Sequence, residues 1–170
     1  MFSIRNLTKN HEAFEWGGDL GGLAMRLQIE RYNILGIQLR EELDGMKKRN
    51  DWLKSANDAL AQLRVNRPIN DKMHAYGEIT DPQGNKQTVY AWMLKNHIPV
   101  PYGINSGSQQ DFDAAISNVK AAIDTANSDS QMALIHLQSL MDKVNQCVQL
   151  TTNLVAKDGK VKENVMGNIR

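Results

Sequence analysis

The chain has 170 residues, of which 41% are hydrophobic and 23% charged, a composition typical of a folded protein with a buried core. Its 20 basic and 19 acidic residues leave a net charge of +1, which removes the electrostatic argument for binding nucleic acid or an anionic membrane surface. The single cysteine, Cys147, excludes an intrachain disulfide and a four-cysteine zinc site. No apolar run approaches the roughly 18 residues of a membrane span, and we expect no secretory signal in residues 1–22.

Residues 1–22 are predicted to form a flexible N-terminal arm. Gly17-Gly18 and Gly21-Gly22 interrupt any regular pattern, and the apolar residues of this segment are too scattered to define one face. We expect the arm to be mobile or to depend on a partner. The alternative is that it packs on the core.

Residues 23–67 are predicted to form the first long helix. Apolar residues recur there at alternating spacings of four and three, which is the pattern of a coiled-coil face. Pro68 ends this helix because it lacks an amide donor and disfavours the helical conformation of the residue before it. The residues assigned to the seam with a second helix are Leu39, Leu43, Met46, Leu53 and Leu60.

Residues 68–107 are predicted to form a small insertion with a β-hairpin. The sequence Asp81-Pro82-Gln83-Gly84 is typical of a type I turn, with proline at its second position and glycine at its fourth. Residues 76–80 and 86–90 on either side are the expected strands. Residues 91–96 can then form one or two helical turns.

Residues 108–156 are predicted to form the second long helix, followed by a tail at 157–170. Ser108 and Asp111 have the spacing of a capping box, with aspartate in place of the usual glutamate. We expect the segment from Lys157 to Lys160 to break the helix. Cys147 falls on its seam as a small apolar residue. The other main seam residues are Phe112, Ile116, Val119, Ile123, Leu137, Leu140, Val144 and Leu154.

A second apolar row lies beside this seam, with a residue at every seventh position: Leu134, Met141, Val148 and Val155. One partner helix cannot cover both rows, so the second row is a candidate assembly interface. Two helices of similar length, joined by a compact insertion, pair most simply as an antiparallel hairpin. The predicted fold is therefore mainly α, a long antiparallel two-helix coiled coil with a small mixed α/β insertion.

The sequence contains no recognisable constellation for catalysis, metal binding or cofactor binding. The four histidines have no metal-ligand spacing, and Cys147 has no activating base near it in the sequence. The glycines at 17–22 follow no strand and precede no P-loop lysine. We therefore predict that the protein is not an enzyme, uses no cofactor and acts in interaction or assembly.

Three stretches of the second helix, at 119–123, 127–132 and 137–141, resemble the C-terminal helix of EspA-like proteins. These are the extracellular filament and needle-tip proteins of bacterial type III secretion systems. The layout of two long helices with a small insertion is also similar to needle-tip proteins. The residue-level resemblance covers about 111–154, and an insertion of this size leaves open a tip cap instead of a long filament.

The resemblance implies a secreted structural protein that self-assembles at the needle tip or as a filament and supports translocator insertion, effector delivery and virulence. Its implied partners are other copies of itself, the needle subunit, the translocator proteins and, before export, a cytoplasmic secretion chaperone; no nucleic acid is expected. It also implies a place at the bacterial cell surface after transient residence in the cytoplasm. The alternative function is a cytoplasmic coiled-coil adaptor or secretion chaperone that binds a partner helix.

Overall fold

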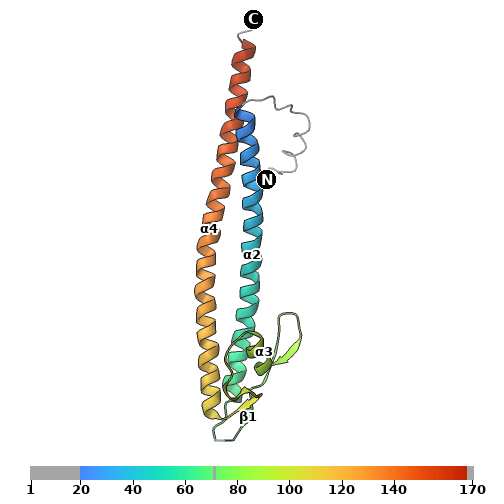
Figure 1. Cartoon of the computed structure of the whole chain (residues 1–170), viewed down its shortest axis with the longest axis vertical. Helices are drawn as coiled ribbons and strands as arrows, with labels where there is room; N and C mark the ends of the chain where they lie inside the picture. The colour runs from blue at the N-terminus through green and yellow to red at the C-terminus, as the bar shows by residue number, and fades with distance from the viewer. Residues whose placement is uncertain (1–19, 71, 168–170) are drawn as a thin grey trace. The chain divides into compact units, whose positions relative to one another are not determined.

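The computed structural model describes residues 20–70 and 72–167 (Figure 1). The chain is mainly helical, as predicted, and divides into a terminal unit (residues 1–40 with 138–170) and a central unit (residues 41–137). Both long helices contribute to each unit. The elements in chain order are α2 (Leu20–Asn66), β1 (His74–Ala75), β2 (Glu78–Thr80), β3 (Lys86–Thr88), α3 (Val89–Lys95), η2 (Pro101–Gly103), β4 (Ser106–Gly107) and α4 (Gln109–Gly167).

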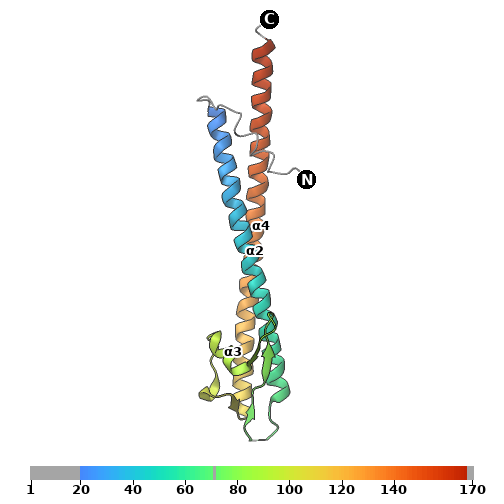
Figure 2. The same ribbon diagram turned by 90° about the vertical axis from the view of Figure 1, so that its right-hand side faces the viewer.

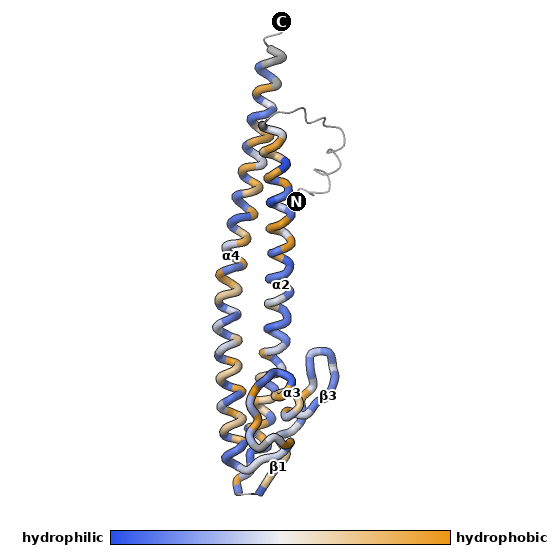
Figure 3. Tube along the Cα trace, in the orientation of Figure 1, coloured by the Kyte–Doolittle hydropathy of each residue, from blue (hydrophilic) through white to orange (hydrophobic). Residues whose placement is uncertain are grey.

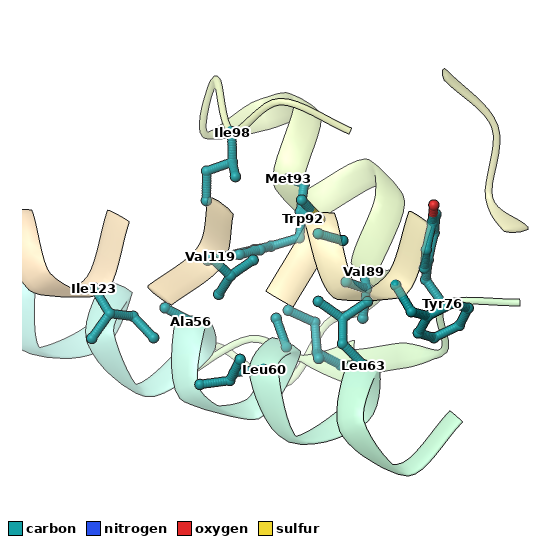
Figure 4. Close-up of a cluster of buried hydrophobic side chains, with 14 residues drawn as sticks. Ala56, Leu60, Leu63, Tyr76, Val89, Trp92, Met93, Ile98, Val119 and Ile123 are labelled. Atoms are coloured by element: carbon teal, nitrogen blue, oxygen red, sulfur yellow. The ribbon is translucent and has the colours of Figure 1, made fainter. Parts of the chain in front are cut away.

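The core of the central unit joins α2, α4 and the segment between them (Figure 4). Arg67 contacts Asp113 and Glu42 contacts His136, so the two helices run antiparallel within this unit. Alanines on both helices allow close approach, and larger side chains fill the space at the insertion. The buried members of the core are Ala56, Ala59, Leu60, Leu63, Tyr76, Ile79, Val89, Trp92, Met93, Ile98, Phe112, Ala115, Val119 and Ile123.

The helix α3 docks on α2 through a polar contact as well as through its buried side chains. The Trp52 Nε1–H donates to Asn96 Oδ1 at 2.7 Å, and Asn96 Nδ2 donates to the carbonyl of Trp92 at 2.7 Å. The rings of Trp52 and Trp92 lie 5.8 Å apart. These contacts hold the insertion against the side of the helix pair and satisfy an indole donor that burial would otherwise leave unpaired.

The predicted hairpin is confirmed, with shorter strands: 78–80 and 86–88 in place of 76–80 and 86–90, because Val89 and Tyr90 begin α3. Strands β2 and β3 pair antiparallel, with Glu78 opposite Thr88. The Gly84 N–H donates to the Asp81 carbonyl at 2.9 Å, and Gly84 has a φ of +89°, which glycine adopts without strain. The Asp81 carboxylate accepts the backbone N–H groups of Gln83 and Asn85, so the turn is fixed by its own first residue.

A second two-stranded ladder was not predicted. Strand β1 pairs antiparallel with β4, with His74 opposite Gly107. Each strand has two residues, and no alternation of apolar and polar residues marks them. This pairing brings the start and the end of the insertion together.

Both ends of α3 are capped. Thr88 is the N-cap, and its side chain accepts the Ala91 N–H at 3.1 Å. At the other end the Ile98 N–H donates to the Met93 carbonyl and the His97 N–H to the Leu94 carbonyl, which is a Schellman motif. His97 therefore occupies the left-handed position, with a φ of +55°.

One of the two bonds of the predicted capping box is present at the start of α4, from the Ser108 N–H to the Asp111 carboxylate. The backbone N–H and the hydroxyl of Ser108 both donate to Asp111 Oδ2, at 2.8 and 2.7 Å. One turn on, Asp113 accepts two hydrogen bonds from the Arg67 guanidinium, at 2.7 and 2.8 Å. This ion pair lowers the pKa of Asp113 and links the end of α2 to the first turns of α4.

In the terminal unit, the first part of α2 packs on α4 around residues 140–147, and the last turns of α4 extend beyond the start of α2 (Figures 1 and 2). Leu35, Leu140 and Cys147 are buried together, and Tyr32, Leu39 and Val144 pack against them. The Cys147 thiol donates to the carbonyl of Gln28 at 3.1 Å. Leu140 packs near Leu35, whereas Cys147, further along α4, contacts Gln28, which lies earlier in α2. The two helices therefore run antiparallel here as well.

The predicted outer ends of the two long helices are also wrong. The helix α4 does not break at Lys157–Lys160 but continues through Gly159 to Gly167. The helix α2 begins at Leu20 and includes Gly21 and Gly22, which were assigned to the arm. A single glycine costs only about 1 kcal/mol in a helix, too little to end one in the absence of proline. The rest of the predicted arm, residues 1–19, lies outside the described residues.

Candidate interaction surface

The seam predicted on α4 lies on the inner side of this helix. Five of its residues are buried and the other four are partly buried, so the spacing of four and three follows the contact face along the helix. The buried residues are Phe112, Val119, Ile123, Leu140 and Cys147. The partly buried residues are Ile116, Leu137, Val144 and Leu154.

The seam predicted on α2 is only half right. Leu60 is buried and Leu39, Met46 and Leu53 are partly buried, but Leu43 is 48% exposed. The second inner row of α2 lies one residue earlier than predicted and recurs every seven residues. Its members are Gln28, Leu35, Glu42, Arg49, Ala56 and Leu63.

Polar residues in that inner row caused the error. Glu42 accepts a hydrogen bond from Arg49 at 3.1 Å and contacts His136 Nδ1 of α4 at 3.1 Å. These contacts, with that to His136 the largest, lower the pKa of Glu42. A polar layer in an apolar seam favours one register, because a shifted pairing leaves its groups without partners.

Cys147 is a packing residue with a polar contact. It is fully buried between α4 and α2 in the terminal unit, and its thiol donates to Gln28. Among the described residues, no group of three histidine, cysteine or acidic side chains is arranged to hold a metal ion. No described helix is both long and apolar enough to cross a membrane.

The second row on α4 is exposed along its whole length. Leu134, Met141, Val148 and Val155 are 46%, 50%, 46% and 47% exposed. Figure 3 shows apolar positions recurring along α4 between hydrophilic ones. Leu134 belongs to the central unit; the other three belong to the terminal unit, where half-exposed apolar side chains at heptad spacing form a surface that gains free energy when it is covered.

The same part of α4 is poor in charge. Between Gln131 and Ala156, the formally charged residues are Asp142 and Lys143, and the polar residues are mostly amides and hydroxyls. Amides and hydroxyls cost less to remove from water than charged groups. The cores of protein–protein interfaces are depleted in charged residues in the same way.

A second group of exposed apolar side chains lies in the central unit and was missed by the sequence analysis. Ile69 is 97% exposed and Val65 is 79% exposed, at the end of α2 and just after it. Met73 and Ile104 in the insertion are 51% and 46% exposed. Val65, Ile69 and Met73 are four residues apart, but α2 ends at Asn66, before Pro68, so this spacing marks no helical face and no sequence pattern identifies the group.

No protein-family model, no curated protein and no solved structure matches this chain. The exposed apolar surfaces are therefore the features from which its function is inferred.

Proposed function

We propose that this protein is a secreted structural component of a bacterial type III secretion system. It self-assembles at the needle tip or as an extracellular filament and supports the insertion of translocators and the delivery of effectors. Its partners are other copies of itself, the needle subunit, the translocators and a cytoplasmic chaperone before export. It has no catalytic role.

The observation that carries the proposal is the exposed second row of α4. Leu134, Met141, Val148 and Val155 repeat every seven residues, are about half exposed and lie in a segment with little charge. An enzyme does not need such a row, whereas an assembling subunit does. The resemblance of residues 111–154 to EspA-like proteins supplies the type of assembly.

We also propose that α2 and α4 form one long antiparallel coiled coil. The two helices pair antiparallel in the terminal unit and again in the central unit. The inner rows of both helices keep heptad spacing through both units. The exposed apolar residues of the insertion, Ile69 above all, are then the contact for the translocators.

The assembly is tested by placing charge on the second row. We expect the double variant Met141→Glu/Val148→Glu to stay helical and soluble, since both side chains are about half exposed, but to lose self-association and translocation. The matched control is Leu27→Glu/Ile34→Glu, which changes two exposed residues of α2, 58% and 51% exposed, at the same spacing. Circular dichroism measures folding, and sedimentation measures association.

Export is tested separately. We expect the wild-type chain and both double variants to appear in the culture medium only when the needle complex is intact. Retention in the cytoplasm with a bound partner helix would instead support the adaptor or chaperone function. If the wild-type chain is monomeric at high concentration and the charged row unfolds it, the row belongs to the core and the proposal is wrong.

A further inference from the structure

One flank of the terminal unit carries exposed apolar residues of α4 beside partly buried residues of α2. Leu35 and Leu140 are buried in one cluster. Each residue of a helix is rotated by about 100° from the one before, and the two helices run in opposite directions. The residues that directly follow these two leucines, Gly36 and Met141, therefore turn to the same flank. One heptad away, Ile29 and Val148 lie on this flank in the same way.

Gly36 leaves a hole in this surface. A Cβ atom built on Gly36 would have nothing within 4 Å, so no contact inside the chain requires a glycine there. Glycine is the least favourable residue in the middle of a helix after proline. Met141, in contrast, is 50% exposed and projects from the neighbouring helix.

We propose that a second copy of this chain covers this flank, related to the first by a two-fold axis that runs along the helices. This axis places α4 of each copy over α2 of the other. The contact between Gln28 and Cys147 sets Met141 and Gly36 within about two residues of the same level, or about 3 Å along the axis. Met141 of each copy then fills the space over Gly36 of the other.

The other possible two-fold axis, perpendicular to the helices, fits the same surface poorly. It would set Met141 and Val148 of one copy against Met141 and Val148 of the other. It would also leave Gly36 of one copy facing Gly36 of the other. It would also bring Arg26 and Arg40, both exposed on this side of α2, toward their own copies. Like charges that meet in this way are destabilising.

The proposed axis avoids these conflicts. It sets the α2 flank of one copy, with Arg26, Asn33 and Arg40, beside the α4 flank of the other. That flank of α4 carries Gln138, Asn145 and Thr152, which are exposed and uncharged. Amides and hydroxyls accept hydrogen bonds from guanidinium groups, so the rim of the interface is polar and free of repulsion.

This arrangement rests on the self-association in the proposed function and is tested by crosslinking. In a Cys147→Ser background, chains with Gly36→Cys are mixed with chains with Met141→Cys and oxidised. We expect a disulfide between the two kinds of chain and little between two Met141→Cys chains, because a disulfide needs Cβ atoms about 4 Å apart.

A second experiment places a large side chain in the open space over Gly36. We expect Gly36→Leu to leave the helix content equal or higher and to weaken dimerisation at least tenfold in sedimentation equilibrium. Gly45→Leu is the control: Gly45 lies on the same helix, has only one side-chain atom within 4 Å of a built Cβ and is off this flank. The double variant Gly36→Leu/Met141→Ala, which exchanges the large and the small residue, is expected to recover most of the lost affinity.

The results separate this inference from the proposed function. A crosslink between two Met141→Cys chains with none to Gly36→Cys overturns the two-fold axis, as does an oligomer that Gly36→Leu does not weaken; self-assembly then stands. If the chain dimerises only after residues 1–19 are removed, those residues and not a second copy cover the flank, and the inference is also overturned. A wild-type chain that stays monomeric overturns both.

Discussion

The inner row of α2 is the clearest point at which the structure and the sequence pattern disagree, and two leucines on this helix test it. The sequence pattern places Leu43 in the seam, whereas in the structure it is 48% exposed and Leu63 is fully buried. We expect Leu63→Ala to lower the free energy of unfolding by about 2–5 kcal/mol, since it removes buried methyl groups and leaves a cavity. Leu43→Ala is expected to change it by less than about 1 kcal/mol.

The assay is urea unfolding followed by circular dichroism, at a concentration low enough to keep the chain monomeric. Thermal unfolding provides a second measure: for a chain of this length, a loss of about 3 kcal/mol lowers the Tm by roughly 6–12 °C. The low concentration matters because an assembly partner would also bury side chains on the flank of Leu43. Equal losses for the two variants, or a larger loss for Leu43→Ala, would refute the assignment of the inner row.

Three further predictions concern two polar contacts and one backbone conformation. Cys147→Ser is expected to stay folded and to assemble, with a loss of about 1 kcal/mol or less, because its hydroxyl can donate to the Gln28 carbonyl as the thiol does; a folded variant without function would contradict this. His136→Ala is expected to raise the pKa of Glu42 toward its ordinary value of 4.5, as measured by NMR titration. Because the folded pKa of Glu42 is lowered, its contribution to stability is present above pH 4.5 and is lost as the pH falls through the folded value. His97→Gly is expected to raise stability by about 0.5–1 kcal/mol, since glycine adopts the left-handed conformation without strain; an unchanged urea midpoint would contradict this.

Local chemistry was enough to predict several elements from the sequence. The hairpin at 78–88 follows from Asp81, Pro82 and Gly84, which favour the same turn whatever surrounds them. The start of α4 follows from Ser108 and Asp111, which lie three residues apart and hydrogen-bond to each other. The inner face of α4 was predicted because nearly every position on it is apolar or small, so a period of seven is visible without knowledge of the partner.

Contacts distant in sequence decided the rest. Glu42 and Arg49 lie on the inner side of α2, where they pair with each other and Glu42 also contacts His136 of α4; a pattern of apolar residues does not reveal such positions. Strands β1 and β4 exist only because their pairing closes the insertion. The flank that carries Gly36 and Met141 likewise becomes visible only when α2 and α4 are placed side by side. The sequence by itself therefore determined the two long helices, the start of α4 and the turn, since neighbouring residues specify them, and tertiary packing decided which side of α2 faces inward.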